Sequence, residues 1–183
     1  MAFRMLLITS IALLLGAGVG TVQALNFNRS PGVLKYYLQQ QFGGNELLMV
    51  PAARAPVNGS FAGFGLEVVY EFIMTEEASP QSTQLGYVRG TAIVVNNSAS
   101  GNTFFVQNVI HYNSGNRQGT LTQQGEAIFE DSPYEFAITG GTGIFRNVHG
   151  YNVGRFVSAT PTPNGTHITT YYEASLSYFN DCH

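Results

Sequence analysis

The chain has one cysteine, no tryptophan and one lysine in 183 residues, and only 10% of its residues are charged. The single cysteine, Cys182, excludes an intramolecular disulfide, so the fold must be stabilised by a buried core. So little charge excludes a disordered tail or a coiled coil. A formal net charge of −3 excludes a basic surface for nucleic acid, and the lone lysine, Lys35, excludes a polybasic patch for a membrane.

Aromatic residues and glycines are plentiful in place of charge. The chain is 44% hydrophobic and 13% aromatic, and it contains 21 glycines. This composition favours β structure, and the length fits one domain with a substantial core.

Residues 1–24 have the three-part design of a secretory signal peptide. Arg4 supplies a positive start, Met5 to Gly20 carry no charge, and a Val-Gln-Ala stretch precedes a plausible cleavage point before Leu25. The apolar run is short for a bilayer span of about 20 residues. We therefore expect cleavage and export, with a retained signal anchor as the alternative.

Four asparagines begin N-x-S/T acceptor sequences for glycosylation: Asn28, Asn58, Asn96 and Asn164. Pro31 directly after Ser30 weakens the first, so the expected glycosylation sites are Asn58, Asn96 and Asn164. Asn96 and Asn164 lie in turn-like stretches, where a glycan can be accommodated. The sequence predicts an exported glycoprotein.

Two regions follow the leader. In residues 25–63 the apolar residues follow no clear period, apart from a helix-like patch at Val33–Phe42. We therefore expect this region to form an extended N-terminal arm. Residues 64–183 contain short β-like runs separated by turn-forming residues, and we expect them to form the folded domain. The runs are Phe64–Met74, Leu85–Val95, Thr103–Tyr112, Gly119–Phe129, Tyr134–Thr139, Tyr151–Ala159 and Thr166–Phe179.

These runs predict an antiparallel meander, closed as a barrel or folded as a sandwich. The last run is long enough to bend into two strands, which gives seven or eight in all. In the first run, Leu66 to Met74 form an apolar face on alternate residues, and the opposite face mixes apolar residues with Glu67 and Glu71. Such a mixed face either meets water or lines a lumen for one small ligand. A second subunit or the arm would then cover the apolar face, so we expect a homo-oligomer.

Three segments resemble plant dirigent proteins. They are FGLEVVYEFIMTEEASPQSTQLGYVRGTA (64–92), TLTQQGEAIFEDSPYEFAITGGTGIFRNVHGY (120–151) and ITTYYEASLSYF (168–179), and GGTGIFR (140–146) is the most specific part. The resemblance implies an all-β fold, an eight-stranded antiparallel up-and-down β-barrel. It also implies a secreted, glycosylated homo-oligomer, a dimer or trimer, in the apoplast.

The resemblance further implies a function without a cofactor. Dirigent proteins capture phenoxy radicals or related phenylpropanoid intermediates and impart stereoselectivity on their coupling. The oxidation is performed by a separate laccase- or peroxidase-type oxidase, so the chain would be an auxiliary protein and not an oxidising enzyme.

A second resemblance gives the alternative. FEDSPYEFAITGGTGIF (129–145) is similar to a stretch of allene oxide cyclase, a related barrel. That likeness implies an isomerase or cyclase that acts on a reactive small molecule. The secretory leader and the match over 64–92 favour the dirigent family, because a plastid transit peptide is rich in Arg and Ser. A structural or carbohydrate-binding barrel of the cell wall is a third hypothesis.

Few charged residues interrupt the aromatic faces, and these are the candidate site residues. A carboxylate at Glu71, where many dirigent proteins have Asp, with His149 or Arg155 beside it, is suited to general acid or base catalysis. The alternatives are a solvent-facing carboxylate at Glu71 and a structural histidine at His149. The expected substrate pocket contains Tyr87, Arg89, His111 and Tyr171.

Other chemistries find no support in the sequence. The four histidines lack metal-ligand spacing, and no nucleotide-binding glycine motif or G-x-S-x-G nucleophile motif is present. The sequence predicts neither a metal nor a cofactor.

Overall fold

The computed structural model describes residues 32–57, 62–129 and 131–179. Within these residues the chain forms nine β-strands and no helix. The strands are β1 (Gly32–Gln41), β2 (Glu46–Val50), β3 (Glu67–Thr75), β4 (Gln84–Ser98), β5 (Gly101–Ser114), β6 (Arg117–Ile128), β7 (Tyr134–Gly143), β8 (Val148–Thr162) and β9 (Gly165–Tyr178).

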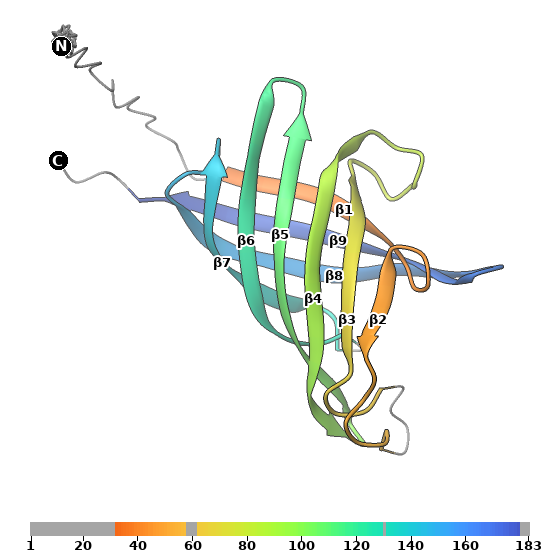
Figure 1. Cartoon of the computed structure of the whole chain (residues 1–183). Coiled ribbons are helices and arrows are strands. Elements are labelled where there is room, and N and C mark those ends of the chain that lie inside the picture. Colours follow the sequence, from red (N-terminus) through yellow and green to blue (C-terminus); the bar gives the residue numbers. More distant parts are fainter. Residues whose placement is uncertain (1–31, 58–61, 130, 180–183) are drawn as a thin grey trace, which may run out of the picture.

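The strands form one antiparallel sheet in the order β1-β9-β8-β7-β6-β5-β4-β3-β2. β1 also pairs with the end of β3, at Tyr37 opposite Thr75, and this pairing closes the sheet. β2 pairs with the beginning of β3 and remains on the edge. In Figure 1, β3 to β6 stand upright in front, and β1, β9 and β8 cross behind them. The predicted eight-stranded antiparallel barrel is confirmed, with β2 as an additional strand.

The barrel begins earlier in the chain than the sequence predicts. β1 includes most of the helix-like patch, yet it pairs with β9 along its whole length, from Gly32 opposite Leu176 to Gln41 opposite His167. The expected arm of residues 25–63 is therefore wrong for its described part, because β1 and β2 belong to the sheet. The last run stays one strand, β9, and β1 supplies the eighth strand of the barrel.

The core fills the inside of the barrel. Val68, Tyr70, Phe72 and Met74 of β3 are buried, which confirms the apolar face expected for this strand. Val88 of β4 and residues of the following strands meet them from the neighbouring positions. The strands of the closed barrel thus turn alternate side chains into one shared interior.

The structure tests only some of the features linked to export. Asn96 and Asn164 are exposed, at the end of β4 and in the turn between β8 and β9. The predicted signal peptide, Asn58 and Cys182 lie outside the described residues. Across the described ranges, no helix has the length and apolar character needed to cross a membrane.

Candidate functional site

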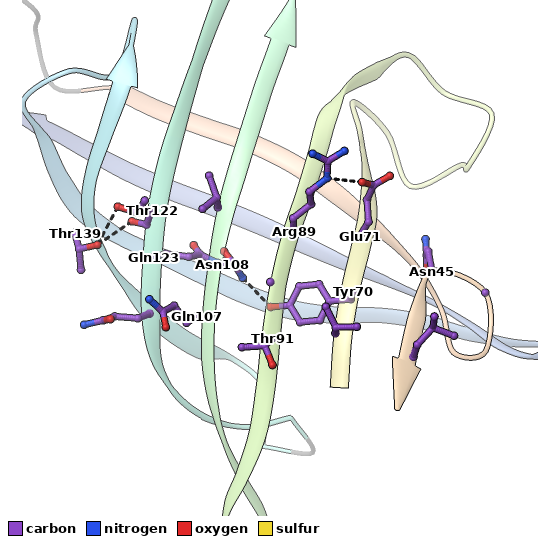
Figure 2. A pocket seen from close by; sticks show the side chains of 16 residues that line it. Asn45, Tyr70, Glu71, Arg89, Thr91, Gln107, Asn108, Thr122, Gln123 and Thr139 are labelled. Carbon is purple, nitrogen blue, oxygen red and sulfur yellow. Dashed lines mark hydrogen bonds and ion pairs between the residues drawn. The ribbon is translucent and has the colours of Figure 1, made fainter. Parts of the chain in front are cut away.

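A groove of about 820 Å³ crosses the outer face of the barrel from the β1–β2 turn and β2 to β7. Four strands each line it with three consecutive residues, namely 69–71 of β3, 89–91 of β4, 107–109 of β5 and 122–124 of β6. The outer two side chains of each triplet point away from the core, and the middle residue belongs to the inward face. Figure 2 shows these side chains across the sheet.

Eight of the sixteen residues that line the groove are Asn, Gln or Thr, and they place hydrogen-bonding groups on a largely apolar surface. Gln107 and Gln124 lie directly opposite each other on β5 and β6. The hydroxyls of Thr122 and Thr139 are 3.0 Å apart, and the hydroxyl of Thr91 donates to the backbone oxygen of Val68 at 2.8 Å. The volume lies within the range of about 300–1,000 Å³ that is usual for small-molecule sites. The groove therefore offers hydrogen bonds over an area that can hold a small molecule.

The β3–β4 part of the groove carries an ion pair. Glu71 and Arg89 are direct neighbours on β3 and β4, and Arg89 Nε donates a hydrogen bond to Glu71 Oε2 (Figure 2). This hydrogen bond raises the pKa of the Arg89 guanidinium. The guanidinium carbon also lies 4.2 Å from the centre of the Tyr87 ring, a cation–π geometry. The pair fixes both charges at the rim of the groove.

An aromatic stack continues from this ion pair. The rings of Tyr87 and His111, neighbours on β4 and β5, are stacked with their centres 4.5 Å apart. Partial burial and the charge of Arg89 lower the pKa of His111, and the charge of Glu71 opposes them. The structure therefore brings four of the predicted site residues into one cluster: Glu71, Arg89, Tyr87 and His111.

The remaining predicted residues lie elsewhere. Arg155 and Tyr171 are opposite each other on the outer face of β8 and β9. His149 stacks on Phe179, with ring centres 4.1 Å apart, and its buried Nδ1 has no hydrogen-bond partner. The structure does not bring these residues to the groove.

The mixed faces do not line a lumen. In β3 and β4 the residues that point into the barrel are those on either side of Glu71 and Arg89, such as Tyr70, Phe72 and Val88. Because side chains alternate, the predicted pocket residues on these strands must point outward. The expectation of a lumen-facing pocket is wrong for this cluster, and binding by these residues stays a prediction.

Sequence reasoning missed a belt of buried amides and phenols. Asn152 Nδ2 donates to Tyr36 Oη and to Gln123 Oε1, both at 2.7 Å. Asn108 Nδ2 donates to Tyr70 Oη at 3.0 Å. The Oδ1 atoms of both asparagines are buried without a hydrogen-bond partner. The signal for this belt was available, since Asn108, Gln123 and Asn152 each lie between apolar residues or glycines two positions away on the same face.

Gly90 makes one of these contacts possible. It lies on β4 between Tyr70 of β3 and Asn108 of β5. A Cβ atom at Gly90 would come within 2.3 Å of Asn108 Cβ, so only glycine lets the phenol reach across β4. Burial raises the pKa of Tyr70, and the phenol remains protonated as a hydrogen-bonding group.

Aromatic rings fill the space beyond the belt. Tyr36 and Tyr172 are stacked with centres 5.4 Å apart, and the hydroxyls of Tyr134 and Tyr172 are 3.2 Å apart. A Cβ atom at Gly154 would lie 2.4 Å from the Tyr134 ring. The centre of the barrel is thus a packed core, whereas the groove on its outer face has space for a ligand.

Glu46 is a carboxyl group that the sequence did not single out. It lies opposite Tyr70 in the pairing of β2 with β3, and cross-strand partners point to the same face. Its side chain is therefore on the inward face at the edge of the barrel. Burial raises the pKa of Glu46, and its charge in turn raises the pKa of Tyr70. Glu46 is the kind of carboxyl group that can serve as a proton donor.

The site supplies hydrogen bonds, an ion pair and aromatic surface. Among the residues that the structure describes, no group of three or more His, Cys, Asp or Glu could hold a metal ion. Such an arrangement can bind and orient a small polar or aromatic molecule.

The family comparison matches residues 33–173 to the family described as dirigent-like protein. This match begins inside β1 and ends inside β9, so it spans the closed barrel. A search of curated proteins gave no significant match.

Solved structures share the fold. The pterocarpan synthase dirigent proteins PsPTS1 and GePTS1 match with TM-scores of 0.70 and 0.69, each at 21% identity over 82% of this chain and over 96% and 92% of theirs. The Diels–Alderase AbmU from Streptomyces koyangensis matches with a TM-score of 0.52 at 17% identity, over 81% of this chain and 64% of that chain.

Proposed function

The chain belongs to the dirigent-like protein family, and we propose that it binds phenoxy radicals or related phenylpropanoid intermediates and imparts stereoselectivity on their coupling. A separate laccase- or peroxidase-type oxidase generates the radicals, and the protein itself oxidises nothing. The outer groove of about 820 Å³ is the proposed binding site and the observation that carries this proposal.

The lining of the groove suits this task. Coupling two radicals joins two unpaired electrons in one new bond, so the reaction needs no nucleophile from the protein. The protein has only to present one face of each radical. The side-chain amides of Gln107 and Gln124 can form hydrogen bonds with phenolic hydroxyls, while the carboxylate of Glu71 is already paired with Arg89. A tenfold preference for one product requires about 1.4 kcal/mol, and one or two hydrogen bonds supply this.

The test adds an oxidase and a phenylpropanoid phenol to the purified protein and measures the product enantiomers by chiral chromatography. We expect no product without the oxidase and an unequal enantiomer ratio with it. The double change Gln107→Leu and Gln124→Leu should lower the ratio roughly two- to tenfold for each hydrogen bond lost. Gln118→Leu, an exposed position of β6 outside the groove, is the matched control. Racemic products from the unchanged protein across a panel of phenols would overturn the proposal.

Glu46 favours a second candidate, an isomerase or cyclase. An inward carboxyl group with a raised pKa could protonate a closed-shell intermediate such as a quinone methide or an allene oxide. This activity would need no oxidant and would fall at least tenfold in Glu46→Gln. If the protein leaves both kinds of compound unchanged, the second candidate is rejected.

We also propose that the protein is exported, glycosylated at Asn96 and Asn164, and assembled as a dimer or trimer. The exposed positions of both asparagines support glycosylation. β2 supports assembly, because its apolar residues from Leu47 to Val50 are about half exposed on the edge of the sheet. Mass spectrometry of the secreted protein would test glycosylation, and analytical ultracentrifugation would test assembly.

A further inference from the structure

Two tyrosines lie side by side on the outer face of the barrel, away from the groove. Tyr37 of β1 and Tyr171 of β9 are direct cross-strand partners. Their ring centres are 5.2 Å apart, and the ring planes are tilted by 51°. Because the adjacent Tyr36 and Tyr172 point into the core, Tyr37 and Tyr171 point outward, where both are partly exposed.

A carboxylate is hydrogen-bonded to one of these phenols. Tyr171 Oη donates to Glu173 Oε2 at 3.0 Å, and Lys35 Nζ lies 3.4 Å from the same oxygen. The hydrogen bond from Tyr171 and the charge of Lys35 lower the pKa of Glu173, so its carboxyl group is ionised at neutral pH. A phenol gives up an electron more readily when its proton can pass to a base at the same time. Tyr171 is therefore prepared for one-electron oxidation.

We propose that Tyr37 and Tyr171 form a dityrosine cross-link when a one-electron oxidant acts on the protein. The proposed function provides such an oxidant, which is either a phenoxy radical or the oxidase that makes it. The cross-link rests on the proposed function only for the source of this oxidant. The geometry itself does not depend on what the groove binds.

The cross-link forms by two one-electron oxidations followed by the coupling of two radicals. The oxidant takes one electron from each tyrosine, and each phenol loses one proton, the proton of Tyr171 passing first to Glu173. The two radicals then join through the ring carbons next to the hydroxyls. The hydrogens on those carbons move to the oxygens as the rings regain aromaticity. The protein loses two electrons and two protons in all, and the oxidant is reduced by two electrons.

The position gives the cross-link a structural role. β1 closes the barrel between β9 and β3, so a bond from Tyr37 to Tyr171 ties the closing strand to its neighbour. A cross-link that closes a long loop restricts the unfolded chain strongly. The sequence has one cysteine and cannot use an intramolecular disulfide for this purpose.

The test treats the dilute full chain with a peroxidase and hydrogen peroxide. We expect a monomer lighter by two hydrogens, dityrosine fluorescence and a linked peptide pair that contains Tyr37 and Tyr171. The thermal midpoint should rise by roughly 5 °C or more. Tyr37→Phe and Tyr171→Phe should each abolish the linked pair, and Glu173→Gln should slow its formation roughly tenfold or more. Tyr151→Phe removes an exposed tyrosine of β8 outside the pair and is the matched control.

The outcomes separate this inference from the proposed function. Failure to form the linked pair in folded protein, or an unchanged yield in Tyr171→Phe, would overturn the cross-link. Neither readout involves a phenolic product. A racemic coupling product together with an efficient cross-link would therefore reject the stereo-directing function alone.

Discussion

Asn152 holds together the buried belt of the barrel. Its amide donates to both Tyr36 and Gln123, and all three side chains are almost completely buried. Replacing it with leucine leaves a phenol and an amide without their partner in a packed core. An unpaired buried polar group costs about 1–3 kcal/mol, so its burial is unfavourable even where packing is retained.

We expect Asn152→Leu to lower the free energy of unfolding by about 2–4 kcal/mol, measured by urea denaturation. The exposed Asn113→Leu is the control and should change it by less than about 0.5 kcal/mol. Equal effects at the two positions would show that the belt contributes nothing to stability.

His111 reports the electrostatics of the cluster beside the groove. Burial and Arg89 lower its pKa below the ordinary value of 6.5, and Glu71 acts in the opposite direction. The unfolded chain therefore takes up this proton more readily than the folded one. The contribution of His111 to stability is present above pH 6.5 and is lost as the pH falls through the lower, folded pKa.

An NMR titration of the His111 ring should give a midpoint below 6.5. Arg89→Leu should raise the midpoint, and Glu71→Gln should lower it further, because each change removes one of the two opposing charges. Thr139→Val, at the opposite end of the groove, is the control and should leave it unchanged. A midpoint above 6.5 would contradict the geometry described for this cluster.

For single residues, the sequence shows which side chains alternate between the two faces of a strand, but it does not show which face the barrel encloses. Tyr70 and Glu71 could be assigned to opposite faces of β3 from their spacing alone. Which face met water depended on how the sheet curves, and a mixed face looked equally suited to a lumen. Glu71, Arg89, Tyr87 and His111 were therefore all among the predicted site residues, but their grouping without His149, Arg155 and Tyr171 and their position outside the barrel were not predicted.

Among the strands, β3 to β9 were predictable, and the first two strands were not. β3 to β9 each correspond to a run bounded by turn-forming residues. β1 carries tyrosines and glutamines at spacings that suit a helix as well as a strand. Its strand conformation depends on two neighbours, since Leu38 is opposite both Thr170 of β9 and Met74 of β3. Such pairing between distant segments overrides local propensity, and the local sequence of β1 does not reveal it.

This two-sided pairing predicts how the strands tolerate proline. Leu38→Pro removes a backbone donor from a strand that is paired on both sides, and we expect a loss of about 3 kcal/mol or more. Met49 lies at the register irregularity of the edge strand β2, so Met49→Pro should cost less than about 1 kcal/mol. Thermal unfolding followed by circular dichroism measures both. A larger loss in Met49→Pro would show that β2 is essential to the barrel.

At the scale of the whole molecule, the barrel depends on a strand that precedes the expected domain boundary at residue 64. Without β1, β9 loses its partner along ten residues, and β3 loses its partner at its end. Two unpaired strand edges would then be exposed, and the buried side chains of Tyr36 and Leu38 would be missing from the core.

We therefore expect a chain of residues 32–183 to fold and a chain of residues 64–183 to fail. The longer chain retains every strand of the closed sheet, so it should melt in one cooperative transition and elute as a defined species in size-exclusion chromatography. The shorter chain exposes the edges of β9 and β3 and should aggregate or give no cooperative melt. A peptide of residues 32–41 added in excess should restore part of the transition, because β1 pairs as a continuous strand. Cooperative melting of the shorter chain at the same temperature would contradict this prediction and would mean that the barrel folds without β1.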